Sequence, residues 1–171
     1  TTYVVDYRSL KSEQYRVKIT VGRDILVYLD DAGSPAANLV ETKLLVNSTI
    51  LDAKHGARFI SADIKGFFLA TPMKECEYMK VQYKHIPTDI RDQYNLDAKV
   101  TSDNCIYSRI KKGMYGLKQA AVLAYNQLKD KLLPKGYSPV KGTVGLWKYA
   151  TRKIKFCLCV DDFGIKYFNK E

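Results

Sequence analysis

The sequence is poor in the residues that build zinc sites, disulfide frameworks and membrane-spanning segments. Only two histidines accompany four cysteines, and they lack the paired spacing that is typical of a zinc site. No apolar run approaches the ~18 residues that a membrane span needs, and no signal peptide opens the chain. We therefore expect a reducing, intracellular environment, no membrane partner, and cysteines that serve as small buried hydrophobic residues.

Acidic residues are almost missing from one long stretch of the chain. Between Arg109 and Lys155, twelve Lys or Arg residues stand beside a single acid, Asp130, so this stretch carries +11 where the whole chain carries +10. Such a concentration of positive charge favours a polyanionic partner, because neutralising phosphates releases counterions. A solvated basic face is the other interpretation, and charge alone does not choose between the two.

The order of polar and apolar residues predicts one α+β domain. The chain has 171 residues and begins with Thr1 rather than Met, so we interpret it as a piece of a longer protein. We expect an antiparallel sheet with helices packed on one face. A helix should begin at Ser34–Pro35 and stop at Gly56, because a hydroxyl cap followed by proline favours a helix start. A further helix is expected over residues 119–133, and a short helix or a loop over residues 87–94. Strands are expected over residues 15–21, 58–64, 77–83, 105–110, 144–149, 155–160 and 163–168.

Two adjacent acids, Asp161 and Asp162, lie between two apolar stretches. The stretches predict a β-hairpin, which places both carboxylates at its tip. Two like charges side by side repel each other, and a divalent metal ion would remove that repulsion. An exposed turn is the alternative, because Asp is common in turns.

A third acid, Asp63, ends an expected strand and precedes the sequence Ile-Lys-Gly-Phe-Phe-Leu. Its simplest role is that of a cap or turn residue. If its strand lies beside the 155–168 hairpin, however, three carboxylates converge. Two Mg²⁺ ions held there would serve in-line phosphoryl transfer.

Three motifs, in this order, resemble those of copia-type reverse transcriptases, the polymerases of a class of LTR retrotransposons. They are Asp63 with the six residues that follow it, residues 112–120 (Lys-Gly-Met-Tyr-Gly-Leu-Lys-Gln-Ala), and Val160-Asp161-Asp162. The middle motif is quite specific, and the resemblance covers nearly the whole chain. It implies a fingers-and-palm core that copies an RNA or DNA template from a primer, with deoxynucleoside triphosphates as substrates.

The resemblance also implies roles for individual residues. Asp63 and Asp161 would ligate two Mg²⁺ ions, or Mn²⁺ in their place, with Asp162 completing the acidic cluster. The carbonyl of Ile64 would help to hold the nucleotide-bound metal. Phe68, five residues after Asp63, would form a floor beneath the sugar that excludes a 2′-hydroxyl.

The remaining implied roles concern nucleotide and template. Gln119 would contact the incoming nucleotide, and Arg16 or Lys18 would clamp its triphosphate. Lys111, Lys112 and Lys118 lie in the basic stretch and are the candidate nucleic-acid-binding residues. By the same resemblance the thumb and ribonuclease H are absent here, and the full element would add ribonuclease H, integrase and protease segments. It would work in a cytoplasmic particle or the nucleus.

One residue departs from the family's motif around the acid pair, and another segment of the chain imitates that motif. Cys159 stands where the family has Tyr, two residues before the acid pair. Tyr28-Leu29-Asp30-Asp31 fits the family's Tyr-x-Asp-Asp pattern more literally, but no apolar strand follows it, so we interpret Asp30 and Asp31 as a turn.

Two other functions compete with the polymerase. A decayed or domesticated relic would keep the fold and the basic face and would bind nucleic acid without catalysis. A small-molecule phosphotransferase would need a glycine-rich phosphate loop. Gly22, Gly33 and Gly56 stand alone, so the sequence offers no such loop.

Overall fold

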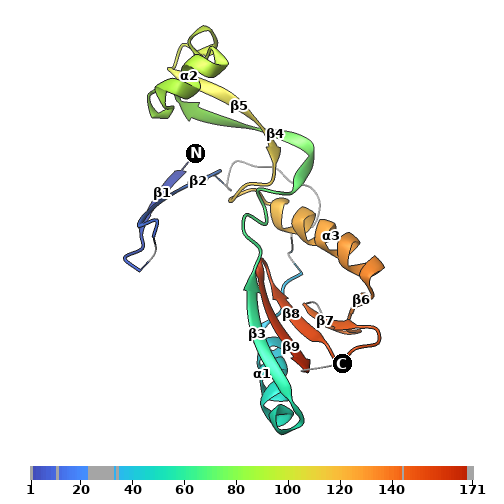
Figure 1. The fold of residues 1–171 in the computed structure, drawn as a ribbon. Coiled ribbons are helices and arrows are strands. Elements are labelled where there is room, and N and C mark those ends of the chain that lie inside the picture. Colours follow the sequence, from blue (N-terminus) through green and yellow to red (C-terminus); the bar gives the residue numbers. More distant parts are fainter. Residues whose placement is uncertain (1, 11, 23–32, 34, 144, 169–171) are drawn as a thin grey trace. The chain divides into compact units, whose positions relative to one another are not determined.

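The chain divides into two compact units (Figure 1). The structure is a computed structural model that describes residues 2–10, 12–22, 33, 35–143 and 145–168. The first unit comprises the described residues of Thr1–Leu29 and Phe68–Ala120, and the second those of Asp30–Phe67 and Ala121–Glu171. Each unit has its own sheet structure and its own hydrophobic cluster.

The first unit contains two antiparallel hairpins. Strand β1 (Thr2–Tyr7) pairs with β2 (Tyr15–Thr20), and β4 (Pro72–Gln82) pairs with β5 (Cys105–Lys112). The register of the second hairpin shifts at a bulge between Pro72 and Glu77. Between β4 and β5 lie the short helix α2 (Thr88–Tyr94) and the 3-10 turns η3 (Tyr83–His85) and η4 (Asp97–Lys99). The hydrophobic cluster centres on the buried residues Ile110, Leu117 and Ala120.

The second unit is built around a five-stranded antiparallel sheet with the strand order β3-β9-β8-β7-β6. Figure 1 shows β3, β9, β8 and β7 side by side. Trp147, Phe156 and Leu158 form the buried cluster of this unit. The strands are β3 (Ala57–Asp63), β6 (Tyr137–Pro139), β7 (Leu146–Tyr149), β8 (Lys155–Cys159) and β9 (Asp162–Phe168), and the helices are α1 (Leu39–Leu51), η2 (Ala53–His55), α3 (Ala120–Leu132) and η5 (Leu133–Lys135).

The α+β class agrees with the prediction, but the helices of the second unit lie on opposite faces of the sheet rather than on one. Alternate residues of a strand point to opposite faces. On β8, Phe156 and Leu158 pack with Leu128 of α3, whereas the sulfur of Cys159 lies 3.8 Å from the hydroxyl of Thr42 on α1. The sheet is therefore covered on both sides. Within the described ranges, no helix is long and apolar enough to cross a membrane.

Helix α1 begins later than the predicted Ser34–Pro35. Its N-cap is Asn38, whose side chain accepts from the backbone N–H of Glu41, and the Glu41 carboxylate accepts from the Asn38 N–H in return. This reciprocal capping box satisfies two backbone donors at once, which makes it a strong helix start. Ser34 lies outside the described residues. Gly56, in the left-handed conformation at φ 91°, ends the 3-10 turn after α1, as predicted from its position.

Candidate functional site

The acid pair stands at the turn of the β8–β9 hairpin. Cys159 of β8 and Asp162 of β9 are cross-strand partners, so Val160 and Asp161 form a two-residue loop. Val160 has a positive φ of 65°, in the first loop position, where turns of this length favour glycine. A β-branched residue in this conformation is strained, and such strain gathers at functional sites. The hairpin tip predicted from the sequence is therefore present, with a strained backbone beside the acids.

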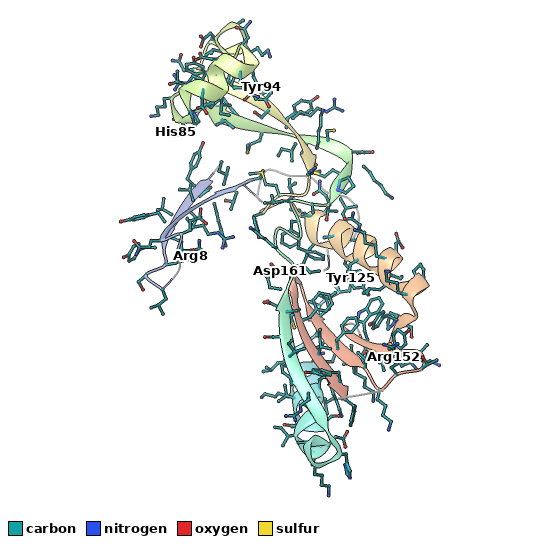
Figure 2. The ribbon with its side chains drawn as sticks, viewed as in Figure 1. Arg8, His85, Tyr94, Tyr125, Arg152 and Asp161 are labelled. Carbon is teal, nitrogen blue, oxygen red and sulfur yellow. The ribbon has the colours of Figure 1, made fainter. Side chains whose placement is uncertain are left out.

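Asp63 lies beside this pair. It is the last residue of β3 and the direct cross-strand partner of Asp162. The chain just beyond is tied to the hairpin as well, because the N–H of Ile64 donates to the carbonyl of Asp161 at 3.0 Å. Side chains directly opposite one another share a face of the sheet, with Cβ atoms about 5 Å apart. The structure thus brings Asp63, Asp161 and Asp162 together at one end of the sheet, where Figure 2 labels Asp161.

The three acids form no ion pair with a cation of the described residues. The nearest cation along β9, Lys166, is instead buried and bonded to Asp52 and Ser48. Like charges opposite each other on a sheet are destabilising, so the pairing of Asp63 with Asp162 has a cost in stability.

Asp63, Asp161 and Asp162 offer carboxylate oxygens, the ligand type that Mg²⁺ takes in proteins. In the described ranges, no group of three or more His, Cys, Asp or Glu side chains is placed so that it could hold a metal ion. Mg²⁺, however, is usually bound through one or two carboxylates together with water and substrate phosphates rather than by an all-protein cage. Asp63 and Asp162 are exposed and Asp161 is half-buried, so solvent reaches all three carboxylates.

Cys159 packs against the start of α1 and the segment before it. Its sulfur lies 3.6 Å from the carbonyl oxygen of Ala37 and 3.8 Å from the hydroxyl of Thr42. Cys157, two residues earlier on the same strand, is buried, and desolvation raises the pKa of that thiol. Cys105 and Cys157 are buried, as predicted, whereas Cys76 and Cys159 are only partly buried.

In the first unit, the two glycines of the 112–120 motif permit close backbone contacts. A Cβ on Gly113 would lie 2.6 Å from the carbonyl oxygen of Phe68, and the Gly113 N–H donates to the carbonyl of Thr71. Gly116 has φ 96°, and a Cβ there would lie 2.1 Å from the carbonyl oxygen of Val21. Only glycine fits both requirements at this position. The motif therefore joins the end of β2 to the turn that carries Phe68.

Phe68 packs through the same motif. Its ring meets the ring of Tyr115 edge-on, with centroids 5.3 Å apart, and it lies against the hydrophobic cluster around Ile110. The ammonium of Lys18 lies 5.3 Å from the centroid of the Tyr115 ring, a cation–π distance. Tyr115, which sequence reasoning assigned no role, thus links Phe68 to the basic strand β2.

A groove of about 730 Å³ runs between β2 and β5 in the first unit. Its lining includes five cations and no acid. Arg16 and Lys111–Lys112, predicted to bind triphosphate and nucleic acid, are brought together here; Lys118 is not among the lining residues. The groove is lined by Arg16, Val17, Lys18, Ile19, Leu69, Met79, Ser108, Arg109, Ile110, Lys111, Lys112, Gly113, Met114 and Tyr115.

Gln119 is buried directly before α3. Only 6% of it is exposed, and its side-chain Nε2 donates to Oε1 of Glu77 on β4 at 2.9 Å. Sequence reasoning missed Glu77, because nothing in the order of residues shows which acid of β4 the motif meets. The structure assigns Phe68 and Gln119 to the first unit and the three acids to the second. Asp30 and Asp31 lie outside the described residues.

Comparison with known proteins adds no relative. No protein-family model, curated protein or solved structure matches this chain.

Proposed function

We propose that this chain is the fingers-and-palm core of a copia-type reverse transcriptase. It would add deoxynucleotides to a primer on an RNA or DNA template, as part of a longer polyprotein that works inside the cell. The observation that carries the proposal is the pairing of Asp63 with Asp162, with Asp161 in the adjoining turn. The order of the three sequence motifs and the basic groove support it.

The acids are the proposed metal ligands. Asp63 and Asp161 supply carboxylate oxygens to two Mg²⁺ ions, Asp162 adds negative charge beside them, and the carbonyl of Ile64 helps to hold the nucleotide-bound ion. Bound Mg²⁺ supplies charge stabilisation and activation of the attacking hydroxyl for in-line transfer. Val160, at φ 65°, places a strained backbone position directly beside the acid pair.

The first unit supplies the proposed substrate contacts. The ring of Phe68 excludes a ribose 2′-hydroxyl, and Gln119 contacts the nucleotide. Arg16 or Lys18 binds its triphosphate from the groove wall. Lys111 and Lys112 bind the phosphate backbone of template or primer, as does Lys118 from outside the groove.

A non-catalytic relic is the second candidate. The observation that favours it is Cys159, because the sulfur of this residue is packed against Thr42 and Ala37, where the family has a tyrosine that supports the primer end. A relic would bind duplex through the basic groove but add no nucleotide. The two candidates therefore differ in metal-dependent incorporation, not in nucleic-acid affinity.

The deciding experiment is primer extension in Mg²⁺ by the wild type, Asp161→Asn and Asp30→Asn, with circular dichroism to show that each variant folds. Asp161→Asn should lower incorporation about a thousandfold or more, since it removes a ligand that stabilises transition-state charge. Asp30→Asn should leave incorporation nearly intact. Duplex binding without incorporation by the wild type would favour the relic, and loss of activity in Asp30→Asn alone would overturn the site.

A further inference from the structure

The hydrogen bond between Gln119 and Glu77 fixes which end of the Gln119 amide is available. A carboxylate can only accept hydrogen bonds, so the amide must turn its NH₂ group toward Glu77. The other end, the carbonyl oxygen Oε1, is then directed elsewhere. That oxygen is buried and has no hydrogen-bond partner within the described part of the chain. The amide is held at one end and unsatisfied at the other.

A buried side-chain carbonyl without a hydrogen-bond partner is unusual, so its presence at Gln119 needs a physical explanation. The large majority of buried side-chain polar atoms in proteins have a partner. The neighbours of Gln119 in the motif, Leu117 and Ala120, belong to the apolar cluster around Ile110. An apolar side chain at position 119 would suit that cluster and would leave neither an unpaired oxygen nor a need for an acid nearby.

Glu77 is held in place by the sheet. It is the cross-strand partner of Ile110, whose side chain is part of the same cluster, and it follows the bulge that shifts the register of β4. The bulge re-aims the residues after it, as bulges near functional sites often do. The carboxylate of Glu77 thus reaches the amide of Gln119 from a rigid strand.

We propose that Glu77 is a positioning residue, which holds the Gln119 amide so that Oε1 is presented as an acceptor to a hydrogen-bond donor on a bound nucleoside triphosphate. The proposal rests on the proposed function, in which Gln119 contacts the nucleotide. Glu77 itself does not touch the substrate. Its role is to prevent the amide from rotating and offering NH₂ in place of the oxygen.

A reciprocal exchange of the two side chains tests this role. Glu77→Gln leaves two amides that can pair in either sense, so the correct orientation is no longer enforced. We expect KM for deoxynucleotide to rise on the order of tenfold, the worth of one hydrogen bond, with kcat little changed. Gln119→Glu places two carboxylates together and should be worse. In the double exchange the amide at position 77 donates to the carboxylate at position 119, whose second oxygen remains an acceptor, so KM should return toward the wild-type value.

The matched control is Glu75→Gln, which removes the same charge from an exposed position of the same strand. The orientation can also be measured without catalysis, because the side-chain NH₂ resonances of Gln119 in a ¹⁵N spectrum should shift and lose exchange protection in Glu77→Gln but not in Glu75→Gln. If the wild type incorporates nucleotide and Glu77→Gln keeps the KM of Glu75→Gln, the positioning role is wrong and the polymerase stands. The positioning role is also wrong, whatever the activity, if the Gln119 NH₂ resonances are unprotected in the wild type and do not shift in Glu77→Gln. If the wild type incorporates no nucleotide but the NH₂ resonances shift as predicted, the polymerase proposal is wrong. The hydrogen bond by which Glu77 orients the Gln119 amide would then still be established.

Discussion

Asp63 and Asp162 face each other across adjacent antiparallel strands, although they lie far apart in the sequence. The pairing follows from the register of β3 and β9, which is set along its whole length, from Ala57 opposite Phe168 to the acids at the other end. A shift of one residue would send one acid to the opposite face of the sheet. The register is therefore what makes a shared site from these two acids.

The first prediction concerns this pair. Asp63→Asn should raise the free energy of unfolding in metal-free buffer by roughly 0.2–1 kcal/mol, because it removes a like-charge pair directly across the strands. Mg²⁺ should stabilise the wild type and have less effect on the variant, since an ion that binds only the folded state shifts the unfolding equilibrium. Thermal melts with and without Mg²⁺ measure both effects. Asp130→Asn, an exposed acid in the same unit, should change neither; equal Mg²⁺ responses in all three proteins would contradict the metal site.

Sugar selection gives a second prediction. Phe68→Ala should admit ribonucleotides while deoxynucleotide addition survives in part, because the ring that would meet a 2′-hydroxyl is gone. Phe68→Tyr keeps the ring and should keep the selectivity. The measurement is the ratio of ribonucleotide to deoxynucleotide incorporation. An unchanged ratio in an active Phe68→Ala variant would remove Phe68 from the sugar site.

The hairpin that carries the acid pair was predictable because its pattern is local. The apolar stretches on either side of Asp161–Asp162 predict two strands and their turn, and the strands are found at 155–159 and 162–168. The sequence predicted that the three acids converge only if the strand of Asp63 lies beside the hairpin, since no local pattern shows which strands are neighbours. The structure shows that β3 pairs with β9.

The packing of α1 was not predictable from its apolar residues. Five apolar residues have helical spacing: Leu39, Val40, Leu44, Leu45 and Leu51. Of these only Leu45 is buried, and the other buried positions are Glu41 and Thr49. The Glu41 side chain is buried because it completes the capping box at the helix start. Helical spacing therefore located the helix but did not reveal which side faces the sheet, nor that α1 and α3 take opposite faces.

The basic groove gives a third prediction. If its cations bind phosphates, duplex affinity should fall steeply with salt, and replacing Lys111 and Lys112 by Glu should weaken binding equally for all sequences. The slope of log affinity against log salt should become shallower by about one for each phosphate that is no longer neutralised. Lys84→Glu with Lys99→Glu, in the same unit but outside the groove, should have a smaller effect. A flat salt dependence in the wild type would reduce the groove to a solvated basic face.

A fourth prediction tests the glycine of the middle motif. Gly116→Ala should destabilise by more than the ~1–2 kcal/mol of a left-handed alanine, because its Cβ would also collide with the backbone oxygen of Val21 at 2.1 Å. Gly56→Ala has a similar φ of 91° but open space around the new Cβ, so it should show the conformational cost alone. Urea unfolding gives both values. Equal costs would mean that the close approach of Gly116 to Val21 does not constrain the first unit.

The last prediction concerns Lys166, a buried cation on the same strand as Asp162. Lys166 is only 4% exposed, and its ammonium contacts the carboxylate of Asp52 at 2.5 Å and two oxygens of Ser48. The hydrogen bond from Lys166 lowers the pKa of Asp52 below its ordinary value of 3.8, against the rise from desolvation, and the charge of Lys166 lowers it further. A carboxylate whose pKa is lower in the folded state stabilises the fold above the unfolded pKa and loses that contribution as the pH falls through the folded value.

The two partners should therefore respond differently to mutation. Asp52→Asn leaves a buried ammonium without its counter-charge and should destabilise clearly at pH 7, with the difference from wild type shrinking below about pH 4 as Asp52 becomes protonated. Lys166→Met removes the buried charge and leaves Asp52, whose side chain is 44% exposed, to solvent. That change should be close to neutral, because a well-packed apolar residue often replaces a buried ion without a cost in stability. Urea unfolding across pH 3–7 measures both variants, and a Lys166→Met variant less stable than Asp52→Asn would assign Lys166 a role beyond the ion pair.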